Sequence, residues 1–458
     1  MSRIQTFTRF PGSLSSLGLL LLTALAACTD TPRGEPIGIA VDESQVAEGT
    51  YNLHLEDTVR FNPIQPGSDP ARGRRLFGLA ADLETSDPSQ ALFQGPSQAF
   101  GGVVVSNGRS CFTCHRGVQA TALGLPPPPL SRAIPLTDPL FTGLDSDAQG
   151  DPDGMRNLDQ LGLIKYRPHR FNLSRPETDP FRKCFAWRKA IRLVNVAFAS
   201  GFLSDARGRA MFEVDRGAVF SHTQDSDSRF DDLFTVQDGN DLQAFQFGIL
   251  SDPRLAALRD PEDPMYAVLV NDPFYTVPIA TAAQRRGSEV FRRSCMTCHS
   301  TPNVFNNLSN VESLGDDTRP PNFPSFAPAV GRTFDIGVAE RNRHHLRFTH
   351  DDGGGRFSPI VIPLANEDGS TNLLTVTFDL GLGAITGRTE DVGRFKVPQL
   401  RGVKHNAPYF HDNSAFSLEE VVDYFNSDHY NSSKDGRKFP IHLDAHQRAD
   451  LLAFLDIL

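Results

Sequence analysis

The sequence predicts a mainly α-helical protein of two similar domains, with an irregular N-terminal segment and a small β-hairpin in the second domain. Three observations support this fold class. The pattern C-x-x-C-H occurs twice, at residues 111–115 and 295–299. A similar arginine-rich stretch that ends in phenylalanine precedes each copy, at residues 71–77 and 284–291; this internal repeat is expected to form the first helix of each domain. Strand-like segments are few.

Each pentapeptide places two thiols one helical turn apart, with an imidazole directly after the second thiol. Each thiol can add to a vinyl group of one porphyrin, and the imidazole then lies under the iron. Disulfides or half zinc sites are the alternatives, but zinc needs further cysteines or histidines at matching spacings, and none follow either motif. The sequence therefore predicts two covalently bound haem c groups. The residues expected to hold them are Cys111, Cys114 and His115, and Cys295, Cys298 and His299.

The first 27 residues have the pattern of a lipoprotein signal peptide. Arg3 and Arg9 form a basic start, residues 17–25 are apolar but too few to span a bilayer, and Leu-Ala-Ala precedes Cys28. A cysteine at this position becomes lipidated; an ordinary signal peptide with an incidental cysteine is the simpler alternative. Because haem is attached covalently outside the cytoplasm, we expect a protein on the periplasmic side of a bacterial membrane, held there only by the lipid on Cys28.

The net charge of the chain indicates which kinds of molecule it can bind. A formal net charge of -10 argues against nucleic acid and against an anionic membrane surface, and it favours an electropositive redox partner. The remaining cysteine, Cys184, is expected to be a small buried apolar residue.

Composition divides the chain into four segments. The region after the signal peptide is polar, contains proline and glycine, and shows little helical periodicity. Asp-Pro pairs between residues 252 and 273 punctuate the joint between the domains, because each proline favours an extended residue before it. The segments are 1–27 (signal peptide), 28–69 (tether), 70–274 (first haem domain, with an insertion between Phe77 and Cys111) and 275–458 (second haem domain).

Two further elements are predicted in the second domain. Residues 373–378 alternate in polarity and can form a hairpin with residues 360–364. Asp444 is the expected cap of a terminal helix whose apolar face contains Leu451, Leu452, Phe454 and Leu455.

Three stretches of the second half closely resemble the bacterial di-haem cytochrome c peroxidase and MauG family: DVGRFKVPQLRG at 391–402, APYFHD at 407–412 and LEEVV at 418–422. A looser resemblance runs through residues 192–198 and 205–207, and the whole covers about residues 70–458. The resemblance implies two cytochrome c folds that face each other. It also implies that His115 binds the haem where peroxide or oxygen reacts, and His299 the haem that takes in electrons.

The sixth ligand of the second iron departs from the family, which uses methionine or tyrosine there. The chain has no methionine after Met296, which lies inside the haem motif, and counting forward from Leu418 puts the ligand position on Phe425, which cannot bind iron. We expect Tyr424 first, with a core aromatic as its structural alternative. An iron without a protein ligand, or ligation by His429 or another histidine, are the other possibilities.

A peroxidatic haem also needs a group that carries a proton between the two peroxide oxygens. Aligned from Asp205, the family's distal glutamine falls on Val214 and its distal glutamate on Gln224, which can donate a hydrogen bond but cannot shuttle a proton. Glu213 and His222 are the nearby groups that could, and His222 is slightly favoured because imidazole titrates near neutral pH. A solvated helix residue and a loop histidine are the alternatives.

Three other positions follow from the resemblance. The family's tryptophan between the haems is Ser204 here, and the chain's only tryptophan, Trp187, is expected in the core, with a substitute role as the alternative. His411 is expected near a haem edge, hydrogen-bonded to a propionate. Lys189 lies near a calcium ligand of the family and would repel the ion, which argues against calcium.

Together these residues predict an oxidoreductase that reduces hydrogen peroxide with electrons from a small cytochrome c or cupredoxin. The first alternative is a MauG-like enzyme that uses high-valent iron or O2 on an organic or protein substrate, and the missing methionine and distal glutamate favour it. The second is a non-catalytic electron carrier, because thirteen histidines leave enough spare iron ligands.

Overall fold

The computed structural model describes part of the chain, and its described residues from 64 to 458 belong to one compact unit. The described residues are 64–80, 99–100, 103–104, 109–116, 124–143, 146–149, 151–166, 184–199, 202–208, 210–221, 234–272, 274–299, 333–352 and 354–458. The predicted signal peptide, Cys28 and most of the tether lie outside them, and the boundary at residue 275 stays a prediction. No helix of the described ranges combines the length and apolar character needed to cross a bilayer.

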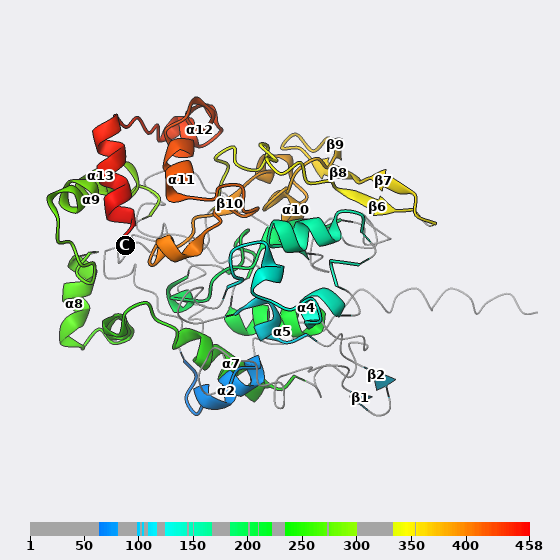
Figure 1. The fold of residues 1–458 in the computed structure, drawn as a ribbon, viewed down its shortest axis with the longest axis horizontal. Helices are drawn as coiled ribbons and strands as arrows, with labels where there is room; N and C mark the ends of the chain where they lie inside the picture. The colour runs from blue at the N-terminus through cyan, green and yellow to red at the C-terminus, as the bar shows by residue number, and fades with distance from the viewer. Residues whose placement is uncertain are drawn as a thin grey trace, which may run out of the picture. The chain divides into compact units, whose positions relative to one another are not determined.

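The described part is mostly helical, and its sheets are small (Figure 1). Up to residue 299 the helices are α2 (Pro70–Phe77), α3 (Cys111–Cys114), α4 (Pro139–Thr142), α5 (Met211–Ser221), α7 (Val236–Phe247), α8 (Pro264–Asn271) and α9 (Ala282–Ser294). Later helices are α10 (Gly383–Thr386), α11 (Leu418–Phe425), α12 (Asp428–Ser432) and α13 (Ala445–Leu455). Short 3-10 or π turns lie at Leu130–Arg132, Arg156–Gln160, Val196–Phe198, Pro253–Arg259, Thr389–Asp391, Val403–Asn406 and Gly436–Lys438. This confirms the mainly α class.

Every sheet in the described ranges has two strands. The antiparallel pairs are β1 (Ala99–Phe100) with β2 (Val103–Val104), β3 (Leu163–Tyr166) with β4 (Ala186–Lys189), β5 (Thr333–Phe334) with β10 (Phe395–Lys396), β6 (Thr349–Asp351) with β7 (Phe357–Pro359), and β8 (Val361–Ala365) with β9 (Thr371–Thr375). A hairpin therefore occupies the predicted stretch, but β9 begins and ends earlier than residues 373–378, because Ser370 and its turn at residues 366–370 set the register.

Helices α2 and α7 cross at a glycine. A Cβ atom on Gly73 would lie 1.9 Å from the carbonyl oxygen of Asp241, so only glycine permits this approach. Arg72 pairs with the Asp241 carboxylate at 2.6 Å on one side of the crossing. On the other side, Phe77 packs edge-on against Phe245 with ring centroids 5.3 Å apart.

Helices α9 and α13 repeat this crossing in the second half. A Cβ atom on Gly287 would lie 1.9 Å from the carbonyl oxygen of Asp450, Arg286 pairs with the Asp450 carboxylate at 2.7 Å, and Phe291 packs on Phe454 at 5.5 Å. Each contact has its counterpart at the same spacing in α2 and α7. The internal repeat is therefore a repeat of structure as well as of sequence.

Local capping explains where several helices begin. Asp444 accepts hydrogen bonds from the backbone of His446 and Gln447, which confirms the predicted start of the terminal helix. Asp252 and Asp263 have the extended backbone expected before proline. Each also caps the helix that begins at the proline after it.

One apolar cluster joins residues from both halves of the chain. It contains Cys184 and Trp187 of the first half together with Phe348, Ile362 and Leu380 of the second. Trp187 is fully buried there and Cys184 is 3% exposed, so the core assignments made for both residues are confirmed.

Candidate haem-binding sites

The first C-x-x-C-H motif forms the short helix α3, which is anchored by its flanking residues. The backbone N–H of Ser110 donates to the hydroxyl of Thr113, inside the motif, at 3.0 Å. Arg109 donates to the backbone carbonyl of Leu140, and Arg116 pairs with Asp138 at 2.6 Å. These contacts attach the backbone on both sides of the motif to α4 and its cap, Asp138. The segment that carries the two thiols and the imidazole is therefore held in place.

The second motif follows α9 without a break. The N–H of Cys295 donates to the carbonyl of Phe291, and the N–H of His299 donates to the carbonyl of Cys295 at 2.8 Å. Burial lowers the pKa of His299 to about 4, although a hydrogen bond to the backbone of Pro398 opposes this shift. The imidazole is therefore neutral at physiological pH, which is the form that binds a metal.

Both motifs occupy the same place on the repeated helix crossing. The ring of His115 lies 6.2 Å from that of Phe77, and the ring of His299 lies 6.5 Å from that of Phe291. All four motif cysteines are free of disulfides and buried enough to raise their thiol pKa, to about 12 for Cys295 and Cys298. Two free thiols followed directly by an imidazole fit covalent haem attachment better than a redox disulfide.

A buried polar atom in the segment 407–412 also fits a haem. His411 stacks on Phe395 with ring centroids 3.9 Å apart, and its backbone carbonyl accepts from the N–H of Lys189. Its Nδ1 atom is buried and has no hydrogen-bond partner among the described residues. A propionate of a haem at Cys295 and Cys298 would supply that partner, as predicted for this residue.

Beside the first motif, helix α5 buries a carboxyl group that the sequence did not single out. Asp215 is 8% exposed, and the side-chain amide of Gln246 in α7 donates to both of its carboxylate oxygens at 2.8 Å. Burial raises the pKa of Asp215 to about 7, although the Gln246 hydrogen bonds oppose the shift. Burial first, and the charge of Asp215 second, raise the pKa of Cys111. The carboxyl group therefore lies near the first haem-attachment residue.

Aromatic side chains gather beside the second motif. Tyr430 contacts the ring of Phe425 at 5.0 Å, and burial together with the charges of Cys298 and Cys295 raises its pKa. Its hydroxyl donates to the backbone carbonyl of Phe439 at 3.0 Å. No sequence pattern pointed to Tyr430, because its proximity to the cysteines depends on the turn between α11 and α12.

The comparisons with known proteins agree with the resemblance read from the motifs. The chain is 40% identical over 81 residues to a cytochrome c peroxidase, IdrP1, of Pseudomonas sp. (strain SCT), covering 18% of this chain and 21% of the relative. It is 27% identical over 180 residues to cytochrome c peroxidase IdrP2 of Denitromonas iodatirespirans, covering 39% and 40%. In these matched parts the chain is similar to cytochrome c peroxidases. It spans less than half the length of these two relatives in the matched parts.

Two solved structures are similar at a lower level. The diheme peroxidase BthA from Burkholderia thailandensis E264 has 16% identity and a TM-score of 0.42 over 87% of both chains. A MauG-like protein associated with microbial copper homeostasis has 21% identity and a TM-score of 0.36 over 60% of this chain and 74% of its own. No protein-family model matches the chain.

The family's sixth-ligand position can be inspected in the structure. The hydroxyl of Tyr424 donates to the backbone carbonyl of Ile336 at 2.5 Å, and burial raises the pKa of this phenol. The imidazole Nε2 of His429 lies 2.8 Å from the carbonyl oxygen of Gly337. Both candidate ligands are thus engaged with the backbone of residues 336–337, and ligation by Tyr424 stays a prediction.

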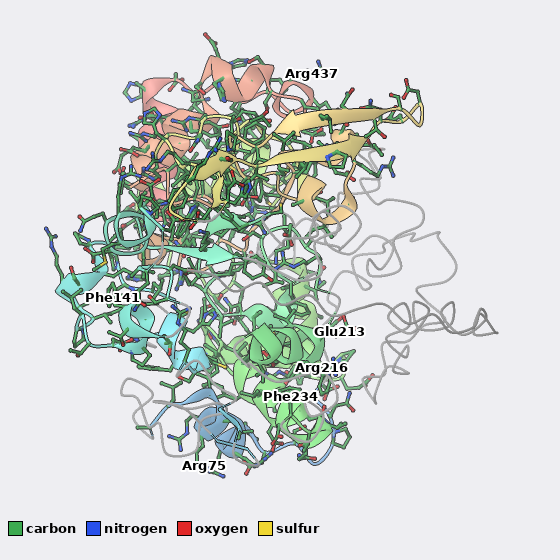
Figure 2. All side chains as sticks on the ribbon, turned by 90° about the vertical axis from the view of Figure 1, so that its right-hand side faces the viewer. Arg75, Phe141, Glu213, Arg216, Phe234 and Arg437 are labelled. Atoms are coloured by element: carbon green, nitrogen blue, oxygen red, sulfur yellow. The ribbon has the colours of Figure 1, made fainter. Side chains whose placement is uncertain are left out.

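The predicted distal residues are only partly visible. Glu213 is exposed on α5, where Figure 2 shows it with Arg216, so this conformation leaves it in solvent rather than in a buried site. His222 and Gln224 lie outside the described residues. The buried carboxyl group on α5 is Asp215, two residues after Glu213. The alignment with the family missed it because only Val214 and Gln224 were compared.

Lys189 holds the segment that carries His411. Its ammonium group donates to the backbone carbonyls of Asn406 and Pro408, and burial lowers its pKa to about 7. The cation therefore bonds two carbonyl oxygens of the kind that a calcium ion would use. The expectation about calcium itself stays untested.

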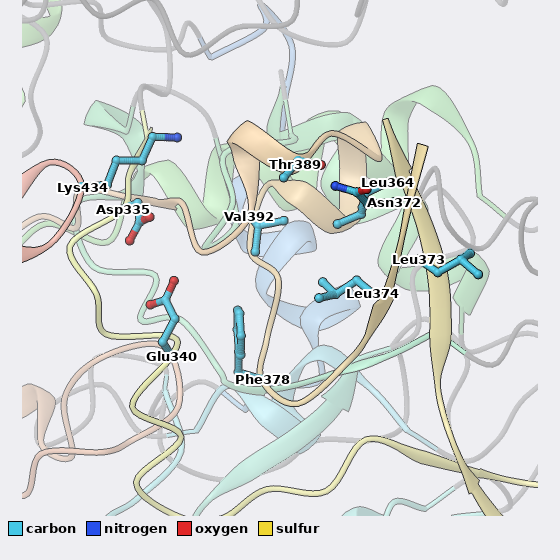
Figure 3. A pocket seen from close by; sticks show the side chains of 10 residues that line it. All are labelled: Asp335, Glu340, Leu364, Asn372, Leu373, Leu374, Phe378, Thr389, Val392 and Lys434. Atoms are coloured by element: carbon cyan, nitrogen blue, oxygen red, sulfur yellow. The ribbon is translucent and has the colours of Figure 1, made fainter. Parts of the chain in front are cut away.

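A separate pocket of about 480 Å³ lies beside the β8–β9 hairpin (Figure 3). The carboxylates of Asp335 and Glu340 face the same space there, with Lys434 nearby and Leu374 and Phe378 on the apolar side. None of its lining residues belongs to a haem motif.

Proposed function

We propose that the chain is a periplasmic, lipid-anchored di-haem c-type oxidoreductase that reduces hydrogen peroxide with electrons from a small cytochrome c or cupredoxin. The observation that carries the proposal is the pair of C-x-x-C-H motifs on two copies of one helix crossing. Sequence similarity to two cytochrome c peroxidases supports it. Bound haem would supply iron that exchanges electrons and reacts with peroxide.

The chain's own residues would divide the work between the two sites. Cys111 and Cys114 would hold one haem, with His115 as its ligand, at the reactive site. The equivalent residues of the second motif, Cys295, Cys298 and His299, would hold the other. Two features suit that second site: the neutral imidazole of His299, and the Nδ1 atom of His411, which has no hydrogen-bond partner within the described ranges.

A MauG-like oxidase is the second candidate, and two observations favour it. The chain has no methionine after Met296 to act as a sixth ligand, and Glu213 is exposed rather than placed as a distal acid. Such an enzyme would act on an organic or protein substrate with O2 or high-valent iron.

Haem counting followed by rapid mixing tests the proposal. We expect two haems per chain by the pyridine haemochrome assay, and one after Cys111→Ser with Cys114→Ser, whereas Cys184→Ala should retain both. The half-reduced protein should then be oxidised rapidly by hydrogen peroxide with a saturable rate. Fewer than two haems in the unaltered protein would reject the di-haem proposal, and reaction with O2 but not peroxide would favour the MauG-like candidate.

A further inference from the structure

The first haem motif has a carboxyl group beside it that no cation neutralises in the described residues. Asp238 and Asp241, on the neighbouring helix α7, are also buried, but both pair with Arg72. Asp215 has instead the uncharged amide of Gln246, bonded to both carboxylate oxygens. Burying a carboxylate without a cation favours its protonated form.

Close packing of α5 on α7 keeps Asp215 in this environment. The ring of Phe212 fills the space where a Cβ on Gly239 would lie only 2.3 Å away, and it packs edge-on against Phe234 at 5.7 Å. In the same interface, three residues further along α5, Asp215 meets the side-chain amide of Gln246 on α7. At 8% exposure the carboxyl group is largely shielded from the water that would solvate it on an isolated helix.

Burial and the hydrogen bonds from Gln246, rather than a nearby charge, determine the pKa of Asp215. On α5 itself, Glu213 is exposed and Arg216 half-buried. On α7, the two aspartates are paired with Arg72 as above, and from α3 the facing titratable group is the thiol of Cys111. Haem attachment would convert that thiol into an uncharged thioether, so the thiol would no longer titrate beside Asp215.

We propose that Asp215 takes up one proton when an electron enters the first haem and releases it when the haem is reoxidised. The inference rests on the proposed haem at Cys111 and Cys114. An electron from a one-electron donor reduces the iron, a proton from solvent neutralises the carboxylate, and no other bond is made or broken. The added negative charge of the reduced site favours the protonated carboxyl, because the two charges repel at low dielectric.

Linkage gives the signature of this coupling. The pKa of Asp215 near 7 in the haem-free protein places the titration within the physiological range. Between the pKa values of the oxidised and reduced states, the potential of the first haem should fall by about 59 mV for each tenfold fall in proton concentration. Outside that interval the potential should not depend on this group.

Spectroelectrochemical titration of the full-length holoprotein, with dye mediators over a pH series, tests the proposal. The wave of the first haem is identified by its displacement in His115→Met. Asp215→Asn should abolish the pH dependence of that wave around neutrality and leave the second haem's wave unchanged. Glu262→Gln, which removes an exposed carboxylate, should change neither wave. An unchanged slope in Asp215→Asn would overturn the inference.

A second variant keeps the test decisive if Asp215→Asn does not fold. Gln246→Leu removes the hydrogen bonds that stabilise the carboxylate, so the pH-dependent interval of the first haem should move to higher pH. No movement would also overturn the inference. Haem counting distinguishes this failure from that of the proposed function: two haems per chain with a pH-independent potential would reject only the role of Asp215.

Discussion

Two carboxyl groups on one helix show how strongly position decides chemistry. Glu213 and Asp215 are two residues apart on α5, yet the first is exposed and the second is 8% exposed and bonded by Gln246. Ionisation of the second carboxyl group is opposed by the free energy of desolvation. Of the two groups, Asp215 is therefore the one suited to exchange a proton near neutral pH.

The burial of Asp215 predicts a pH-dependent cost in stability. The unfolded carboxyl group ionises near pH 3.8, whereas the native one keeps its proton to about pH 7, so the unfolded state binds fewer protons between these values. Native stability from this group is complete below pH 3.8 and is lost as the pH rises to 7. Relative to the unaltered protein, Asp215→Asn should therefore gain up to about 4 kcal/mol in free energy of unfolding across this range.

Urea denaturation at pH values from 4 to 8 measures this difference. Glu262→Gln is the matched loss of one exposed negative charge, and its difference from the unaltered protein should stay flat with pH. A flat difference for Asp215→Asn as well would show that the native carboxyl group is solvated.

Sequence reasoning missed Asp215 for a physical reason. An aspartate on a helix has the same letter whether it faces solvent or the neighbouring helix, and here the distinction depends on α5 packing against α7 at Gln246, which no local pattern reveals. The motif cysteines and histidines could be predicted, because their chemistry depends on spacing within five residues.

At the scale of elements, the helix crossing is the feature that the two halves share. The first helix of each half was predicted from its arginine-rich repeat, and the terminal helix α13 from its cap and apolar face. Helix α7, the partner of α2, was not predicted. The signal was present: Asp-Leu-x-Ala-Phe occurs at residues 241–245 and again at 450–454, and these are the residues that meet the glycine and the phenylalanine at each crossing.

The crossing predicts opposite effects for two glycine-to-alanine substitutions. Gly287→Ala would place a methyl group against the carbonyl of Asp450, force α9 and α13 apart, and cost about 3 kcal/mol. Gly217→Ala, on α5, introduces the same methyl group where nothing lies within 4 Å of it, and should gain about 0.5 kcal/mol through helix propensity.

Thermal unfolding followed at the Soret band compares the two variants. The second haem should also bind less stably in Gly287→Ala, because Phe291 on the same helix contacts His299. Equal melting temperatures for the two alanine variants would mean that the α9–α13 contact is looser than the structure shows.

For the whole molecule, the two halves are joined by a buried network of ion pairs. Arg188 pairs with Asp205 of its own half and, through two nitrogen atoms, with Asp379 of the other half at 2.5 and 2.8 Å. Arg207 also pairs with Asp205, and all four side chains are at most 9% exposed. Such contacts between residues 191 positions apart could not be predicted from local sequence, although both halves could be recognised separately.

Loss of the central cation should therefore destabilise the whole protein. In Arg188→Met, Asp205 would keep Arg207, but Asp379 would remain buried without its cation, at a cost of about 3 to 5 kcal/mol. Arg254→Met removes an arginine whose pairing with Asp252 is exposed, and it should unfold close to the unaltered protein because water replaces such a pair at little cost. Urea unfolding at constant pH measures both variants. Equal midpoints for Arg188→Met and Arg254→Met would mean that the two halves are held together by their apolar cluster alone, with the ion pairs contributing no net stability.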